Sequence, residues 1–227
     1  MAVTLAQLRT QFYNRFDVGT QNYIQPEEAN TLINEGASHL HNWLTAEAEY
    51  LIWEESQISL VPGVSDYPFA PTVQKLLKLF GPDSSGAATS APAWMPMHRI
   101  MPQEYRGANM GATNTIQPFW PYGYMLMGQT LRIIPTPQQE LPLLMWYVPT
   151  YVDMVADTDT VELAVVSGWQ EYIVNHAVIG ARIKEESDPA PLERRQAALM
   201  QLMQASMINR DMGQHQRVVD VTPGTSY

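Results

Sequence analysis

Apolar residues recur every three or four positions in both terminal parts of the chain, a spacing that places them on one face of a helix. The pattern predicts four helices, over about residues 4–16, 26–48, 165–186 and 191–212. Thr4 followed by Gln7 is a capping-box pattern for the first helix, and Pro26 suits the first turn of the second. A short Pro-containing corner separates the last two helices, so we expect them to form a long helical hairpin within a helical bundle.

The pattern changes to short apolar runs and alternation between about residues 57 and 149, which is typical of strands. Two apolar runs flank Gly128 and Gln129, which suit a type II′ hairpin turn because glycine tolerates positive φ at the first loop position. Pro135 should end the second run, and residues 143–147 then follow as the third strand of a meander. We therefore expect an α+β fold, mainly α, with an inserted antiparallel β region.

The domain organisation follows from these elements. We expect residues 1–212 to form a single domain and residues 213–227 an extended C-terminal tail. Within the β region, residues 94–100 read as one strand, and residues 81–92 are rich in small and polar residues and are expected to be an exposed mobile loop. In the tail, residues 217–221 resemble a strand without a neighbouring partner strand in sequence. The tail is either disordered in the isolated chain or orders by adding a strand to a partner.

Charge and composition limit the classes of partner. The chain has 13 Lys and Arg against 23 Asp and Glu, a formal net charge of −10 at pH 7, which argues against tight binding to nucleic-acid phosphates. It has no cysteine, so disulfides, thiolate metal sites and a cysteine nucleophile are excluded. The N-terminus lacks the basic start and apolar run of a signal peptide, and no apolar stretch approaches membrane-spanning length. We expect a cytoplasmically synthesised protein with no membrane partner.

No residue pattern predicts a catalytic, cofactor-binding or metal site. The chain has no Gly-rich phosphate-binding loop, and none of its five histidines forms an i, i+4 pair of the kind that binds metal on a helix. The acidic residues between the β region and the third predicted helix are Asp153, Asp157, Asp159 and Glu162. They lack the glycine and the downstream glutamate of a calcium-binding loop, so we interpret them as a solvated acidic turn that caps the next helix.

The last predicted helix carries two features that concern packing and partners. Leu199, Leu202 and Met203 are expected to form its apolar stripe. Arg194 and Arg195 lie early in the helix, where the helix dipole does not favour cations, and this position hints at a partner outside the chain.

Trp120 and Tyr122 belong to a series of aromatic residues in the β region. A platform for stacked bases would need interleaved lysines and arginines, which are missing here, so a core or subunit-interface role is the better interpretation.

The order of these parts resembles a known family. The chain has an N-terminal L-x-x-L helix, a second helix containing LINEGASHL, and the pattern Y-x-x-x-G-x-x-L-R-I-I-P-x-P from Tyr124 to Pro137. A W-Y-V-P strand, the helical hairpin and the extended tail follow. This arrangement resembles, over nearly the whole chain, the head-to-tail adaptor (connector) proteins of tailed bacteriophages. The loop at residues 81–92 and the size of the β insertion depart from that family.

The resemblance implies a structural virion protein of the head-tail neck that is not an enzyme. It implies a dodecameric homo-oligomeric ring below the portal protein, which joins the head to the tail, continues the DNA channel and meets the next neck or tail protein. Arg194, Arg195, Trp120 and Tyr122 would then lie at the ring or partner interface. The tail residues expected to contact the portal are Arg217, Val218, Val219, Asp220, Val221 and Tyr227.

An acidic subunit suits such a channel, because double-stranded DNA would pass through it without specific binding. Two alternatives remain open. One is another neck or tail component, such as a stopper or tail-tube adaptor. The more distant one is a small hydrolase that uses the acids between Asp153 and Glu162.

Overall fold

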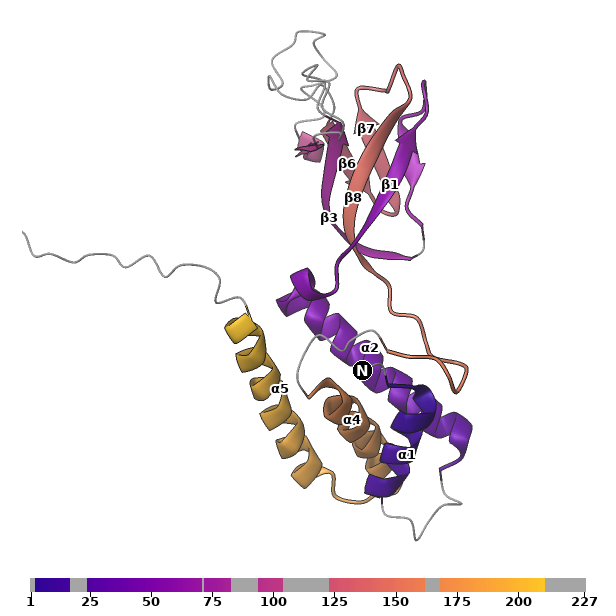
Figure 1. Cartoon of the computed structure of the whole chain (residues 1–227), viewed down its shortest axis with the longest axis vertical. Helices are drawn as coiled ribbons and strands as arrows, with labels where there is room; N and C mark the ends of the chain where they lie inside the picture. Colours follow the sequence, from indigo (N-terminus) through magenta and orange to yellow (C-terminus); the bar gives the residue numbers. More distant parts are fainter. Residues whose placement is uncertain are drawn as a thin grey trace, which may run out of the picture. The chain divides into compact units, whose positions relative to one another are not determined.

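The computed structural model describes residues 3–16, 24–70, 72–82, 94–103, 123–161 and 168–210. The chain divides into two compact units, coloured along the sequence in Figure 1. The helical unit comprises Met1–Ala48 and Val152–Tyr227, and the β unit comprises Glu49–Tyr151. The β unit is therefore an insertion in the sequence of the helical one, as expected from the change of pattern. The assignment of residues 1–212 to a single domain stays a prediction.

The four α-helices of the described residues agree closely with the sequence pattern. They are α1 (Leu5–Phe16), α2 (Pro26–Glu47), α4 (Trp169–Lys184) and α5 (Ala190–Arg210). The capping box is confirmed, because the Thr4 N–H donates to Gln7 Oε1 at 3.1 Å and the Gln7 N–H donates to Thr4 Oγ1 at 3.3 Å. Helix α4 begins later than expected, after Gly168 at a φ of 87°.

The helices bury apolar faces against one another. The buried residues of α1 are Leu5, Leu8, Phe12 and Phe16. Helices α2 and α4 approach closely at Gly36, where an added Cβ would lie 3.0 Å from the Ile173 carbonyl oxygen. On α5, Leu199 and Met203 are buried as expected, but Leu202 is 56% exposed. That part of the predicted stripe is wrong, because the buried stripe of α5 runs through Gln196 rather than Leu202.

The described residues of the β unit form two four-stranded sheets, with the strand orders β1-β8-β3-β4 and β2-β7-β6-β5. Their strands are β1 (Glu54–Leu60), β2 (Asp66–Pro68), β3 (Val73–Pro82), β4 (Trp94–Pro96), β5 (His98–Arg99), β6 (Gly123–Met127), β7 (Thr130–Ile134) and β8 (Leu141–Pro149). The short 3₁₀ helix η2 (Glu49–Leu51) precedes β1. Helices and two sheets together give the expected α+β fold.

The hairpin is confirmed, but the meander is wrong. Strands β6 and β7 pair up to Met127 and Thr130, and Gly128 has a φ of 60° in the two-residue turn. The strand β8 does not join β7. It pairs with β1 on one side and β3 on the other, so β7 and β8 lie in different sheets (Figure 1). Because the chain passes from one sheet to the other between β7 and β8, Leu131 of β7 and Leu143 of β8 bury their side chains in one core between the sheets.

Three further expectations for the β region need correction. Residues 94–100 form two short strands in different sheets, with the buried Met97 between them. The β region is not wholly antiparallel, because His98 and Arg99 of β5 pair with β6 in parallel. Of the loop expected at residues 81–92, Gly81 and Pro82 belong to β3. The remaining residues of that loop lie outside the described part of the chain.

Candidate functional site

The segment that leads from the β unit back into the helical unit, residues 152–161, is bound to the start of α1. We call it the return segment. The Leu5 N–H donates to the Asp159 carbonyl oxygen at 2.9 Å, and the Ala6 N–H donates to the Asp157 carbonyl oxygen at 3.2 Å. Thr4 and Thr160 form an isolated antiparallel bridge beside them. The first N–H groups of a helix have no partner within the helix, so the return segment satisfies two donors that would otherwise need water.

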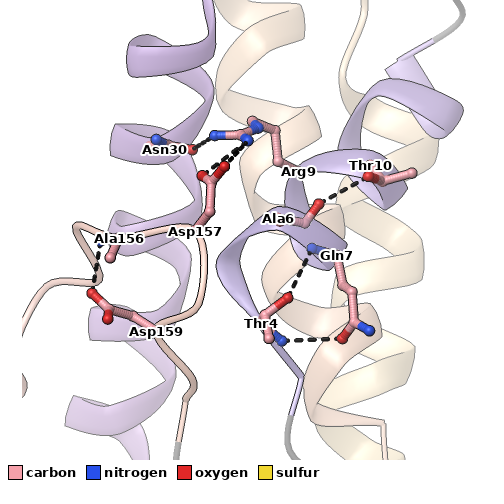
Figure 2. A network of polar contacts seen from close by, with 9 residues as sticks. All are labelled: Thr4, Ala6, Gln7, Arg9, Thr10, Asn30, Ala156, Asp157 and Asp159. Atoms are coloured by element: carbon pink, nitrogen blue, oxygen red, sulfur yellow. Dashed lines mark hydrogen bonds and ion pairs between the residues drawn. The ribbon is translucent and has the colours of Figure 1, made fainter.

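Arg9 ties the return segment to two helices at once. Figure 2 shows its guanidinium group between Asp157 and Asn30. The Arg9 Nη2 atom lies 3.0 Å from Asp157 Oδ1 and 3.1 Å from Oδ2, and Nη1 donates to Asn30 Oδ1 of α2 at 3.3 Å. The Asp157 side chain is 62% exposed, so the ion pair contributes little free energy. Its main effect is to fix the register of the segment on α1.

Asp159 holds the return segment in a tight turn. One of its carboxylate oxygens accepts hydrogen bonds from the N–H groups of Val155 and Ala156, both at 2.8 Å. Figure 2 shows the hydrogen bond from Ala156. These two backbone hydrogen bonds hold the pKa of the Asp159 carboxyl below its usual value. The acidic turn expected here is therefore present, but Asp157 binds α1 and Asp159 binds the turn itself. The expectation that they cap the following helix is not met, and Glu162 lies outside the described residues.

Asn34 of α2 binds the return segment as a neighbouring strand would. Its side-chain amide donates to the Met154 carbonyl oxygen at 3.0 Å and accepts from the Met154 N–H at 3.0 Å. A polar groove of about 440 Å³ lies beside this contact, and its lining residues are Thr31, Asn34, Glu35, Ser38, His39, Asn42 and Asp153. Over the described residues, no group of three acidic or histidine side chains is placed to hold a metal ion.

A cluster of ring side chains lies where α2 meets α4. The Tyr172 hydroxyl group lies 2.8 Å from His39 Nδ1, and the rings of His39 and His176 are 5.2 Å apart. Burial lowers the pKa of His176, and the charge of a protonated His39 lowers it further. The cluster therefore favours the neutral form of the His176 imidazole. No pattern in the sequence links His39 to His176, because local signals do not connect positions so far apart in the chain.

Hydrogen bonds join α4 to α5. The Asn175 amide donates to the Leu192 carbonyl oxygen at 3.0 Å and to Gln196 Oε1 at 2.7 Å. Arg195 Nε donates to Glu171 Oε1 at 2.9 Å. Arg195 thus has a partner within the chain, so its position early in α5 no longer indicates a partner outside the chain.

For Arg194, the position early in α5 still hints at a partner outside the chain. Its side chain is exposed, and it makes no ion pair with another residue in the described ranges. The interface role of both arginines stays a prediction. The other predicted site residues lie outside the described residues, and they are Trp120, Tyr122, Arg217, Val218, Val219, Asp220, Val221 and Tyr227.

Of the helices in the described ranges, none has both the length and the apolar character needed to cross a bilayer. The geometry does not identify the family of the chain, and comparison with known proteins does. Individual curated proteins give no significant match. A family model, that of the SU10 adaptor protein, matches residues 3–225. The chain therefore belongs to the SU10 adaptor protein family, a family of phage adaptor proteins.

Proposed function

We propose that this phage structural protein forms a ring below the portal that joins the head to the tail and continues the DNA channel. The observation that carries the proposal is the family match over residues 3–225. The family is a structural adaptor family and not an enzyme class. The ring is expected to be dodecameric, with the portal on one side and the next neck or tail protein on the other.

The helical unit is proposed to build the ring, with α4 and α5 as a helical hairpin in its wall. Asn175 and Gln196 fix α5 on α4 through a buried hydrogen bond of 2.7 Å, which supports a rigid pair. Beyond its narrow buried stripe, α5 exposes Leu202, Arg194 and several alanines. A face of this kind suits contact with a neighbouring copy, since closed rings join two different surfaces of each subunit.

The charge of the chain suits a channel for DNA. A formal net charge of −10 disfavours contact with phosphates, so double-stranded DNA could slide through the ring without specific binding. The C-terminal tail, including residues 217–221 and Tyr227, is proposed to contact the portal. The β unit would then face the next neck or tail component.

The first test is quantitative mass spectrometry of purified virions that contain this chain. We expect about as many copies of the chain as of the portal protein. Absence from virions would refute the proposal, and so would a copy number on the scale of the major capsid protein, which would indicate a shell or tube component.

A second test uses purified chain and portal, with complexes measured by size and mass. Removal of residues 213–227 should abolish the complex while leaving the helical circular dichroism signal unchanged. Arg194→Glu should weaken ring formation, whereas Gln201→Glu, a control at another exposed position of α5, should not. Normal complexes with the truncated chain would refute the role of the tail. Equal effects of the two point variants would refute the role of Arg194.

A further inference from the structure

Within the described residues, the two sheets of the β unit have four edge strands, and β1 differs from the other three. The edges β2, β4 and β5 are only three, three and two residues long, and β2 and β4 end in proline. Short length and proline both prevent a further strand from pairing. Strand β1 is seven residues long, contains no proline and pairs with β8 without a bulge.

The outer edge of β1 has no partner strand in the part of the chain that the structure describes. Among the described residues, β8 is the only partner strand of β1. In an edge strand, every second residue directs its N–H and C=O groups away from the sheet, where they can accept another strand. The structure therefore presents one edge suited to strand addition.

The side chains of β1 define what an added strand must carry. Ile58 and Leu60 point into the core of the β unit, and Ile58 is only partly buried, so an apolar neighbour could cover it. Glu54 and Glu55 at the start of the strand are exposed. A matching strand thus needs two apolar residues in alternation and a cation near its acidic end.

The chain itself contains such a segment at residues 217–221, with the sequence RVVDV. In a parallel alignment, Val219 and Val221 lie beside Ile58 and Leu60. Arg217 then lies beside Ser56, in the same row as Glu54. An antiparallel alignment centred on the same valine would instead place Arg217 next to Leu60. An antiparallel alignment with Val219 beside Leu60 and Val221 beside Ile58 would keep the apolar pairs but carry Arg217 beyond Leu60, away from Glu54. The charges therefore favour the parallel arrangement.

We propose that residues 217–221 of one copy add as a parallel strand to β1 of a second copy. Helix α5 ends at Arg210, so six residues, 211–216, connect it to the segment and span at most about 20 Å. Donation from each copy to the next is a heterologous contact, the kind that closes rings. The choice of a second copy as the occupant rests on the ring of the proposed function. Because the same residues are proposed to meet the portal, strand addition describes the protein before the portal is bound.

Hydrogen exchange on the isolated full-length protein tests the proposal, read by mass spectrometry at the amides of β1. At a protein concentration at which nine in ten β1 edges are occupied by the segment, the outward amides of β1 should exchange about tenfold more slowly than in dilute protein. Val219→Pro removes a backbone donor from the segment and should abolish this protection. Gln214→Pro, a proline outside the segment, should preserve it.

Three outcomes would overturn the proposal. Protection that is lost in Val219→Pro but does not depend on concentration would show pairing within one copy. Equal protection in both proline variants would show that the segment is not the added strand. Rapid exchange of the outward amides at every concentration would show that the edge is unoccupied. None of these results depends on the portal, so a failure here is distinct from an unequal copy number in virions.

A charge exchange tests the register. Arg217→Glu should reduce the concentration-dependent protection, and Glu54→Arg in the same chain should restore it, because the two charges are then exchanged. No restoration would refute the parallel alignment.

Discussion

Two glycines at the contact between α2 and α4 should respond differently to the same substitution. An added Cβ at Gly36 would lie 3.0 Å from the Ile173 carbonyl oxygen and 3.3 Å from His176 Cβ. An added Cβ at Gly180 would lie 2.9 Å from Leu32 Cδ2, which is the end of a flexible side chain. The first neighbour is backbone and cannot move alone, whereas the second can change rotamer.

The magnitudes follow from two opposing effects. Alanine is favoured over glycine within a helix by about 1 kcal/mol, and this gain applies at both positions. Overpacking against an immobile neighbour costs about 1–3 kcal/mol. Gly36→Ala should therefore lower the free energy of unfolding by up to about 2 kcal/mol. Gly180→Ala should leave it unchanged or raise it by up to about 1 kcal/mol, since Leu32 can move aside.

Urea unfolding followed by far-ultraviolet circular dichroism measures both effects, because both glycines lie in helices. The two variants differ from the wild type by the same methyl group, so each serves as a control for the other. If Gly36→Ala proved as stable as Gly180→Ala, α2 and α4 would not be held together as closely as the structure describes. The explanation of Gly36 as a contact residue would then fail.

Three further predictions concern stability and use the same unfolding measurement. Thr4→Ala removes one half of the capping box and should lower the free energy of unfolding of the helices by about 1 kcal/mol, and an unchanged value would refute the role of the cap. Leu131→Ala should cost about 2–5 kcal/mol, because Leu131 is fully buried, whereas Leu202→Ala on α5, where the side chain is 56% exposed, should stay within about 0.5 kcal/mol of the wild type. Backbone hydrogen bonds lower the pKa of Asp159, so its stabilisation is present above the unfolded pKa of about 3.9 and is lost as the pH falls through the lower folded value. Asp159→Asn should therefore be less stable than the wild type at neutral pH, and a difference that persisted at pH values below the folded pKa would contradict this.

Local chemistry was predictable from the sequence. The capping box of Thr4 and Gln7 and the turn at Gly128 depend on residues within a few positions of one another, and both are confirmed. The partner strands of β8 were not predictable. Glu54 of β1 pairs with Tyr147 of β8, and most of the sequence of the β unit lies between them. An apolar run alone does not indicate which strand it will pair with.

The contacts of the return segment and of α5 show the same limit. Arg9 and Asp157 are 148 positions apart, so neither residue alone indicates the ion pair. On α5, helical spacing allows a stripe through either Leu202 or Gln196, and hydrophobicity favours the leucine. Gln196 is buried instead, because Asn175 of α4 supplies a hydrogen-bond partner. That information resides on the facing helix and cannot be read from α5.

The return segment also leads to a test of the domain organisation. Residues 1–212 were predicted to form a single domain, whereas the chain divides into two compact units at Glu49 and Tyr151. Backbone hydrogen bonds from Leu5 and Ala6, together with the Asn34 amide, hold the return segment on α1 and α2 without using any residue of the β unit. The helical unit should therefore keep its fold when the insertion is removed.

The experiment replaces residues 49–151 with about 15 Gly and Ser residues, a linker with a root-mean-square span of about 20 Å. We expect cooperative unfolding of the shortened chain and a helical signal that matches its helices. Asn34→Ala should lower the free energy of unfolding of the shortened chain. Met154 is buried and would lose both of its hydrogen bonds to the Asn34 side chain. Thr31→Ala, an exposed substitution one turn earlier on α2, is the matched control and should have little effect. An unfolded shortened chain would instead support a single domain, in which the helices depend on the β unit for their stability.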